Sequence, residues 1–197
     1  EEMSVMYNVH LALPFITSGY TIRTREVASK LSEMGLNLDV FARWGFPLDR
    51  TDLEFGESEE ISEEISDSGI SYSFSADKEG MKKHKFEDYC RRAAESILER
   101  GKRKKPIAII SASDASIGLA SSMAARSLGI PFIYEMRGIW AMTRAANNPG
   151  FEGSTRYNLM MRLERQCALS AFRVLTISDE MKKLVESWGV ESSRIIV

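Results

Sequence analysis

The chain has 197 residues, of which 44% are hydrophobic and 27% charged, and its formal net charge is −2. These values are typical of a soluble globular domain with a sizeable core, and they argue against a strongly basic nucleic-acid-binding protein. No apolar run approaches the roughly 20 residues that span a bilayer. Cys90 and Cys167 lie in helical patterns without metal-ligand spacing, so we expect buried thiols, no metal and a reducing, cytoplasmic setting.

Strand and helix patterns alternate along the chain without an internal repeat. Residues 4–13 form an apolar run that predicts a first strand, and residues 21–34 predict its helix, which ends at Gly35. Residues 36–42 alternate apolar and polar side chains, as a second strand does. The acidic segment 50–69 has little periodicity and is predicted to be a solvated loop.

The rest of the chain continues this alternation. We expect helices over 79–100, 116–128, 155–170 and 179–187, and strands over 70–75, 107–111, 131–134, 173–177 and 194–197. Residues 141–153 predict an irregular loop. Strands that alternate with helices form right-handed βαβ units, so residues 1–197 predict a single α/β domain: a doubly wound, Rossmann-like, mostly parallel sheet with helices on both faces.

Ligands of doubly wound sheets bind at the carboxyl ends of the strands. After the first predicted strand, Ser18, Gly19 and Tyr20 precede a helix whose free N–H groups favour phosphate, and Arg23 and Thr24 follow on that helix. The loop has neither G-x-G-x-x-G nor a P-loop lysine, which argues against a standard dinucleotide or P-loop site. Taken alone, the glycine is equally well explained as an ordinary turn residue.

Two later strand ends also carry candidate residues. Arg43 and Trp44 place a cation beside an aromatic ring, which suits sugars and phosphate, although the ring is equally suited to cover the sheet edge. Glu135 and Arg137 follow a buried strand and share one face of extended backbone, so they either pair with each other or contact a hydroxyl and a phosphate. Gly138 permits close approach of a ligand to the backbone.

The remaining polar residues give weaker signals. His10 and His84 have no partner at metal-ligand spacing, so we expect both to be structural or solvent-exposed. Ser178 precedes the helix predicted over 179–187 and is expected to cap it. The sequence contains no nucleophile elbow, H-E-x-x-H motif or Cys/His pair of a hydrolase.

Four segments stand out together: 18–24 (S-G-Y-T-I-R-T), 45–49 (G-F-P-L-D), 130–138 (I-P-F-I-Y-E-M-R-G) and 162–178. In this order and spacing they resemble the amino-terminal half of the family-four glycosyltransferases, which are retaining enzymes with the two-domain GT-B fold. The resemblance implies transfer of a sugar from a nucleotide sugar, such as a UDP- or GDP-sugar, to a glycan, lipid-linked or small-molecule acceptor. It implies no metal and no cofactor besides this co-substrate, and it leaves contact with the inner face of a membrane open.

The same resemblance implies roles for the candidate residues. The donor-phosphate loop would consist of Ser18, Gly19 and Tyr20. The acceptor would be bound by Arg23, Thr24, Arg43, Trp44, Gly138 and Arg156. The catalytic pair would be Glu135 and Arg137, of which the second stands where many family members have a histidine.

In this family the chain continues into a second domain that holds most of the nucleotide sugar. We therefore expect residues 1–197 to be the acceptor-side domain of a longer enzyme, inactive without the carboxyl-terminal domain. Two alternatives stay open because doubly wound sheets serve many functions. One is a stand-alone module that binds a nucleotide or sugar phosphate without catalysis, and the other is a dehydrogenase-type domain, which predicts NAD binding.

Overall fold

The computed structural model describes all residues except 1–2, 54, 56–60, 76–79 and 81–82. Its strands are β1 Met3–Val9, β2 Leu36–Ala42, β3 Glu64–Asp67, β4 Ile70–Ser73, β5 Ala108–Ala112, β6 Phe132–Glu135, β7 Arg173–Leu175 and β8 Ile195–Ile196. They form one sheet in the order β3-β4-β2-β1-β5-β6-β7-β8. Every neighbouring pair is parallel except β3 and β4. The predicted doubly wound, mostly parallel sheet is confirmed.

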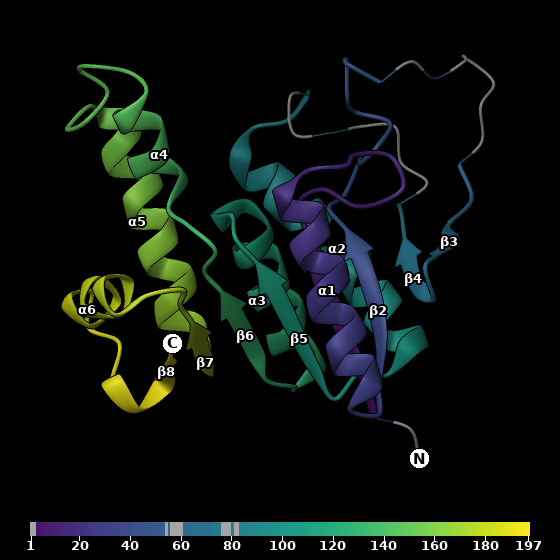
Figure 1. Ribbon diagram of the computed structural model, residues 1–197. Coiled ribbons are helices and arrows are strands. Elements are labelled where there is room, and N and C mark those ends of the chain that lie inside the picture. Colours follow the sequence, from purple (N-terminus) through teal and green to yellow (C-terminus); the bar gives the residue numbers. More distant parts are fainter. Residues whose placement is uncertain (1–2, 54, 56–60, 76–79, 81–82) are drawn as a thin grey trace.

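The helices are α1 Gly19–Glu33, α2 Phe86–Lys104, α3 Ala115–Leu128, α4 Trp140–Ala146, α5 Thr155–Ser170 and α6 Asp179–Ser187. Helix α1 lies over one face of the sheet, and α2 and α3 lie over the other (Figure 1). Helix α5 packs against α3 on that second side. Among the described residues, no helix combines the length and the apolar composition needed to cross a membrane.

The alternation of side chains in β1 supplies both layers of the core. Val5, Tyr7 and Val9 pack into the cluster beneath α1, whereas Met6 packs into the cluster beneath α2 and α3. Because both faces of the central strands are buried, these strands are almost continuously apolar in sequence. The two-sided core holds the parallel strands in register, so their carboxyl ends lie along one edge of the sheet. Ligands are expected at this edge.

The acidic segment predicted as a loop contains strand β3, so this part of the prediction is wrong. The strand pairs antiparallel with β4 through a tight turn in which Ser68 and Gly69 have positive φ angles of 51° and 80°. Such two-residue turns match the twist of a hairpin. The Glu64 carboxylate accepts a hydrogen bond from Arg100, a buried arginine of α2, while Glu54, Glu57, Glu59 and Glu60 lie outside the described residues.

Helix α2 continues through Gly101, where the sequence predicted its end. A Cβ atom at this glycine would lie 2.5 Å from Cδ1 of Leu128, so the glycine allows α2 to pack closely on α3 instead of terminating the helix. Helix α2 ends at Lys104, and the following cap residue, Lys105, adopts a left-handed conformation with φ 47°. The predicted start, at residue 79, lies outside the described residues.

The segment 141–153 was predicted to be irregular, yet most of its first half belongs to α4. This helix has only seven residues and packs against α5, and its Ala141 is fully buried. A helix this short is unstable by itself in water, so its formation depends on packing that the local pattern does not reveal.

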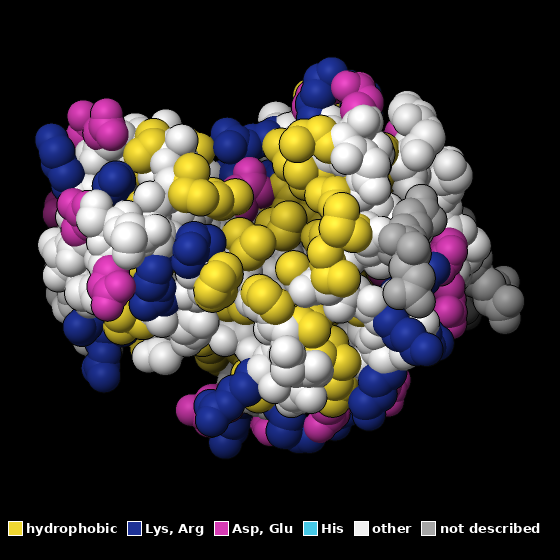
Figure 2. Space-filling model, turned by 90° about the horizontal axis from the view of Figure 1, so that it is seen from below, with side chains coloured by type: hydrophobic (Ala, Val, Ile, Leu, Met, Phe, Trp, Pro, Cys, Tyr) yellow, Lys and Arg dark blue, Asp and Glu magenta, His cyan; other side chains and the backbone are white. Residues whose placement is uncertain are grey.

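The two edges of the sheet differ in character. Seen from the amino ends of the strands, hydrophobic side chains gather in the middle of the surface (Figure 2). Ile107 and Phe172, which directly precede β5 and β7, are about half exposed. The carboxyl edge instead carries the cavities and the polar residues that the sequence pointed to.

Candidate functional site

Two adjoining cavities open at the carboxyl ends of the parallel strands. Cavity A has a volume of about 540 Å³, and its walls include Gly19, Tyr20, Arg23, Arg137, Gly138 and Arg144. Cavity B has a volume of about 660 Å³, and its walls include His10, Arg43, Asp114, Arg156, Leu159 and Glu164. Both are lined by Trp140, Arg144 and Met160, which therefore form their common border.

The first loop reaches cavity A through the start of α1. Ser18 caps the helix: its Oγ accepts a hydrogen bond from the Thr21 N–H at 3.4 Å, and its own N–H donates to Oγ1 of Thr21 at 2.9 Å. This capping box starts α1 two residues earlier than predicted and places Gly19 and Tyr20 on the cavity wall. A Cβ at Gly19 would meet no atom within 4 Å, so the space beside the helix end is open.

Arg137 joins the start of α1 to the end of β6, and all of the N–H groups of its guanidinium are hydrogen-bonded. Its Nε and Nη2 donate to the two carboxylate oxygens of Glu135 at 3.0 and 3.1 Å. Nη1 donates to the carbonyl oxygen of Tyr20 and to Oγ1 of Thr24, both at 2.9 Å, and Nη2 also donates to the hydroxyl of Tyr7. The guanidinium therefore contributes positive charge to cavity A, while its hydrogen bonds hold the wall in place.

Glu135 and Thr24 lie beneath this wall, and neither lines cavity A or cavity B. The Glu135 carboxylate accepts from Tyr7, from Nε of Arg23 at 3.2 Å and from Arg137. Burial, together with the adjacent carboxylate, raises the pKa of Tyr7, so its phenol is neutral. Glu135, predicted as one of the catalytic pair, and Thr24, predicted to bind the acceptor, therefore hold the arginines in place: Glu135 accepts from Arg23 and Arg137, and Thr24 accepts from Arg137.

Cavity A carries a net positive charge. Arg23, Arg137 and Arg144 line it, and none of its described lining residues is a carboxylate. The Arg23 side chain is 47% exposed, and only its Nε is engaged among the described residues. Arg144 lies over the Phe151 ring at 5.1 Å and has no carboxylate partner in the described part of the chain. Arginines that keep free N–H groups beside a helix amino terminus suit a phosphate-bearing ligand.

The second loop is more buried than predicted. Arg43 lines cavity B, but its Nη1 and Nη2 donate to the Asp49 carboxylate at 2.5 and 2.8 Å. Trp44 is a core residue: its ring packs against the Tyr89 ring with the centroids 5.7 Å apart, and it lines neither cavity A nor cavity B. Trp44, predicted to bind the acceptor, thus packs in the core away from both cavities, whereas Arg156, with the same predicted role, lines cavity B.

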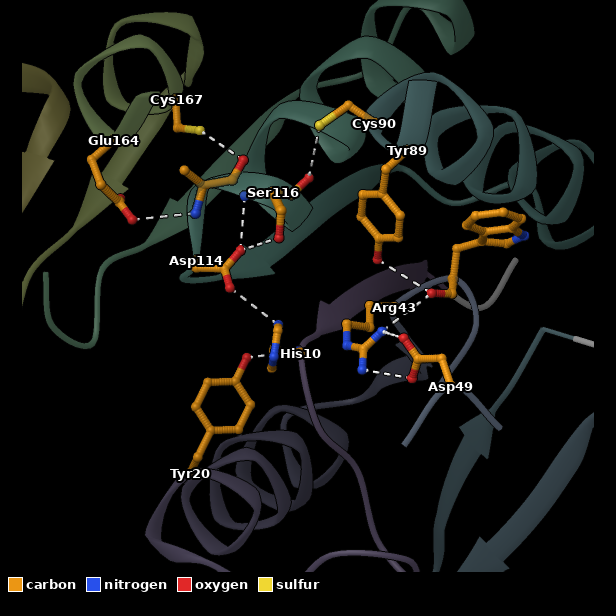
Figure 3. A network of polar contacts seen from close by, with 12 residues as sticks. His10, Tyr20, Arg43, Asp49, Tyr89, Cys90, Asp114, Ser116, Glu164 and Cys167 are labelled. Carbon is orange, nitrogen blue, oxygen red and sulfur yellow. Dashed lines mark hydrogen bonds and ion pairs between the residues drawn. The ribbon is translucent and has the colours of Figure 1, made fainter. Parts of the chain in front are cut away.

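A polar network that the sequence did not predict forms one wall of cavity B (Figure 3). Asp114 caps α3 by accepting from the Ser116 N–H at 2.8 Å, and its Oδ2 lies 3.1 Å from Nδ1 of His10. Burial alone would raise the pKa of Asp114, but His10 and the two donors of Ser116 outweigh it and lower that pKa to about 2. Asp114 is therefore ionised at neutral pH.

Glu164, on α5, lies at the other side of the same network. Its carboxylate accepts from the Tyr134 hydroxyl at 2.6 Å and from the Ala115 N–H at 3.2 Å. Burial raises the pKa of this carboxyl to about 7, with a further contribution from the nearby Asp114 charge. Glu164 thus joins α5 to the start of α3 and to β6.

Four residues at the cavities were not predicted as site residues, and the sequence pattern points to some of them more clearly than to others. Asp114 follows the strand predicted over 107–111, so the carboxyl-edge rule does point to it, whereas His10 lies inside the predicted first strand and follows β1 only because that strand ends at Val9. Arg144 belongs to a segment predicted as irregular, and Glu164 lies in the middle of a predicted helix, so the carboxyl-edge rule points to neither. Among the described residues, no group of three or more His, Cys, Asp or Glu side chains could hold a metal ion.

Comparison with known protein sequences shows the family to which the chain belongs. A sequence model described as a glycosyl transferase 4-like domain matches residues 18–197. No curated protein matches the sequence.

Similar solved structures share the fold at low sequence identity. The Neisseria meningitidis UDP-GlcNAc 2-epimerase bound to UDP-GlcNAc has a TM-score of 0.65 and 13% identity, over 99% of this chain and 45% of the epimerase. Acinetobacter baumannii MurG has a TM-score of 0.54 and 16% identity, over 90% and 41%. Glycyrrhiza uralensis UGT73P12 has a TM-score of 0.52 and 12% identity, over 97% and 48%. The chain spans less than half of each, and the likeness confirms the Rossmann-like fold of one half of a GT-B protein.

Proposed function

Because the chain belongs to the glycosyl transferase 4-like family, we propose that it is the acceptor-side half of an enzyme that transfers a sugar from a nucleotide sugar to an acceptor hydroxyl. In this proposal a second domain supplies most of the donor site, and closure of the two domains brings donor and acceptor together. The expected retention of configuration is part of the same proposal.

The observation that carries the proposal is the positive charge of cavity A at the start of α1. The leaving group of a nucleotide-sugar donor is a nucleoside diphosphate. Negative charge therefore grows on the diphosphate as its bond to the sugar breaks. Arg23, Arg144 and the N–H groups at Gly19 and Tyr20 can stabilise this charge. With this charge balanced by arginines, the proposal requires no metal ion.

Cavity B is suited to the acceptor because it adjoins cavity A and combines polar with apolar walls. Leu159 and Met160 provide apolar surface, and Arg156 provides a cation. Trp140 lies at the common border and is 40% exposed, so its ring can stack on a sugar. An acceptor in cavity B would present its hydroxyl towards a donor held at cavity A.

The proposal is tested on the complete natural protein with a panel of UDP- and GDP-sugars. We expect release of the nucleoside diphosphate to accelerate when glycan, lipid-linked or small-molecule acceptors are added, and product NMR then gives the anomeric configuration. Binding of UDP or GDP without sugar transfer to any acceptor would contradict the proposal and support a stand-alone binding module. Binding of NAD in preference to a sugar nucleotide would support the dehydrogenase-type alternative.

Arg144→Ala gives the sharpest test of the donor position. Loss of a charged hydrogen bond of roughly 1.5 kcal/mol weakens binding about tenfold, so we expect a tenfold higher Kd for the nucleoside diphosphate by calorimetry. Arg173→Ala is the matched control, because this arginine begins β7 at the opposite edge and stacks on Phe172. An equal effect of both substitutions would show that only net charge matters and would remove cavity A as the binding site.

A further inference from the structure

One side of α5 forms a long wall of cavity B. Arg156, Leu159, Met160, Leu163 and Glu164 all line the cavity, and their spacing along the chain places them on one face of the helix. Arg156 lies in the first turn, and Glu164 lies about 12 Å further along the helix axis. The wall therefore has a cation at one end, apolar side chains in the middle and a carboxyl group at the other end.

Arg156 differs from the other arginines of this cavity because its charge is not balanced. Among the described residues, four arginines line cavity B. Arg43 and Arg50 each form an ion pair with an aspartate. Arg144 also lines cavity A, where the proposed function assigns it to the diphosphate. Arg156 is exposed to solvent and has no hydrogen-bond or ion-pair partner in the part of the chain that the structure describes, so it is the unpaired cation that belongs to cavity B alone.

The opposite end of cavity B offers acceptors of hydrogen bonds. Asp114 and Glu164 meet at the first turn of α3, where they accept from the N–H groups of Ser116 at 2.8 Å and Ala115 at 3.2 Å (Figure 3). Both residues line the cavity. A carboxylate has about four lone-pair sites, so each keeps acceptor capacity for a ligand hydroxyl. Cavity B is thus suited to a molecule with hydroxyl groups at one end and an anionic group at the other.

We propose that the acceptor is an anionic sugar or polyol, which carries a phosphate or a carboxylate group, and that Arg156 is the residue that selects it. This inference rests on the proposed function and names its acceptor class. The Arg156 guanidinium binds the anionic group through parallel N–H···O bonds, a geometry that phosphate and carboxylate share. Hydroxyl groups of the same molecule donate to Asp114 and Glu164, while its C–H face packs on Leu159 and on the Trp140 ring at the border with cavity A.

Paired acceptors test this selection in the complete natural protein. Glucose, galactose, mannose and inositol are each compared with their monophosphates, and the hexoses also with their uronic acids, at a saturating concentration of the nucleotide sugar. We expect kcat/KM for the anionic member of a pair to exceed that of the neutral member at least tenfold, because the anionic group gains a charged hydrogen bond. The larger of the phosphate and carboxylate effects identifies the anionic group.

Arg156→Ala should remove this preference without affecting the donor. We expect the KM of the anionic acceptor to rise about tenfold, while kcat, the KM of the nucleotide sugar and the constants of the neutral acceptors stay within about twofold. Arg156→Lys should keep part of the preference, because lysine retains the charge and loses the planar fork. Since the side chain is exposed, neither substitution should change the thermal unfolding of the protein.

Arg162→Ala is the matched control on the same helix. Arg162 is exposed, has no partner among the described residues and lines neither cavity A nor cavity B. We expect wild-type kinetics with every acceptor. If this substitution raises the KM of the anionic acceptor as much as Arg156→Ala does, only the net charge of α5 matters and selection by Arg156 is overturned.

A further comparison identifies the source of the anionic group. Glucose 6-phosphate and glucuronic acid in solution are compared with lipids that carry the same headgroups in phosphatidylcholine vesicles. Transfer that depends on Arg156 supports the proposal with either source, and the acceptor that reacts shows whether the natural one is free in solution or attached to a lipid.

The outcomes separate this inference from the proposed function. A protein that transfers sugar to no acceptor overturns both. A protein that transfers sugar, and uses neutral acceptors as well as or better than their anionic partners, overturns the anionic acceptor alone. An Arg156→Ala variant that is folded and keeps the wild-type preference for the anionic member of each pair overturns the role of Arg156.

Discussion

Two arginine–carboxylate clusters in this molecule have the same chemistry and different positions. Arg100 of α2 donates to both oxygens of Asp39 in the middle of β2, at 2.5 and 2.8 Å, and to Glu64 and Ser73. Arg137 donates in the same bidentate way to Glu135 at the end of β6. Both guanidinium groups are almost fully buried.

What separates the clusters is their place in the sheet. The Arg100 cluster joins a helix to the body of the sheet and lines neither cavity, so we expect it to act on the fold alone. The Arg137 cluster lies at the carboxyl edge, where its outer surface forms a wall of cavity A. Ion pairing by itself therefore does not identify a functional residue, because the position of the pair relative to the strand ends decides what it can contact.

The largest expected effect is that of Arg100→Met on stability. Removing one partner leaves Asp39 charged and buried, so the free energy of unfolding should fall by about 3–5 kcal/mol. Urea unfolding of the domain measures this loss, and the double variant with Asp39→Leu should recover much of it. The affinity of the folded protein for a nucleoside diphosphate should not change. A loss below about 1 kcal/mol would mean that the buried pair is not needed.

Arg137→Lys should have a smaller effect on stability and a clear effect on binding. Lysine keeps the charge but cannot reach Glu135, Thr24 and the Tyr20 carbonyl together, so we expect a loss of about 1–3 kcal/mol of stability. Because the first turn of α1 is then less firmly held, the affinity for UDP or GDP should fall about tenfold by calorimetry. If the substitution lowers stability without changing the affinity for UDP or GDP, the Arg137 cluster has the same purely structural role as the Arg100 cluster.

The smallest expected effect is that of removing the serine caps of two helices, Ser18 of α1 and Ser178 of α6. Ser18→Ala and Ser178→Ala each remove a hydroxyl that accepts from the first turn of a helix, so each should cost about 1 kcal/mol in thermal unfolding. Only α1 begins at cavity A, and the lost order of its N–H groups should weaken binding of a nucleoside diphosphate about threefold in Ser18→Ala. Equal affinities in the two variants would argue against a part for the α1 amino terminus in binding.

The sequence by itself determined the fold class and most of the elements. The apolar, two-sided strands and the amphipathic helices between them are local patterns, and β2, α5 and α6 begin and end where those patterns predict. The carboxyl-edge rule also placed Gly19, Tyr20, Arg23, Arg137 and Gly138 at a common site, and the structure brings all five to cavity A. Local periodicity is enough for these conclusions because each strand must bury both faces.

Only the tertiary structure decided which of the candidate side chains face the cavities. Glu135 and Trp44 follow strand ends just as Arg137 does, yet burial beneath Arg137 and packing against Tyr89 remove them from the cavity walls. Arg144 and the contact between His10 and Asp114 depend on a short helix packed on α5 and on two strand ends 104 residues apart in the chain. Such contacts join residues distant in sequence, and no local pattern encodes the distance between them.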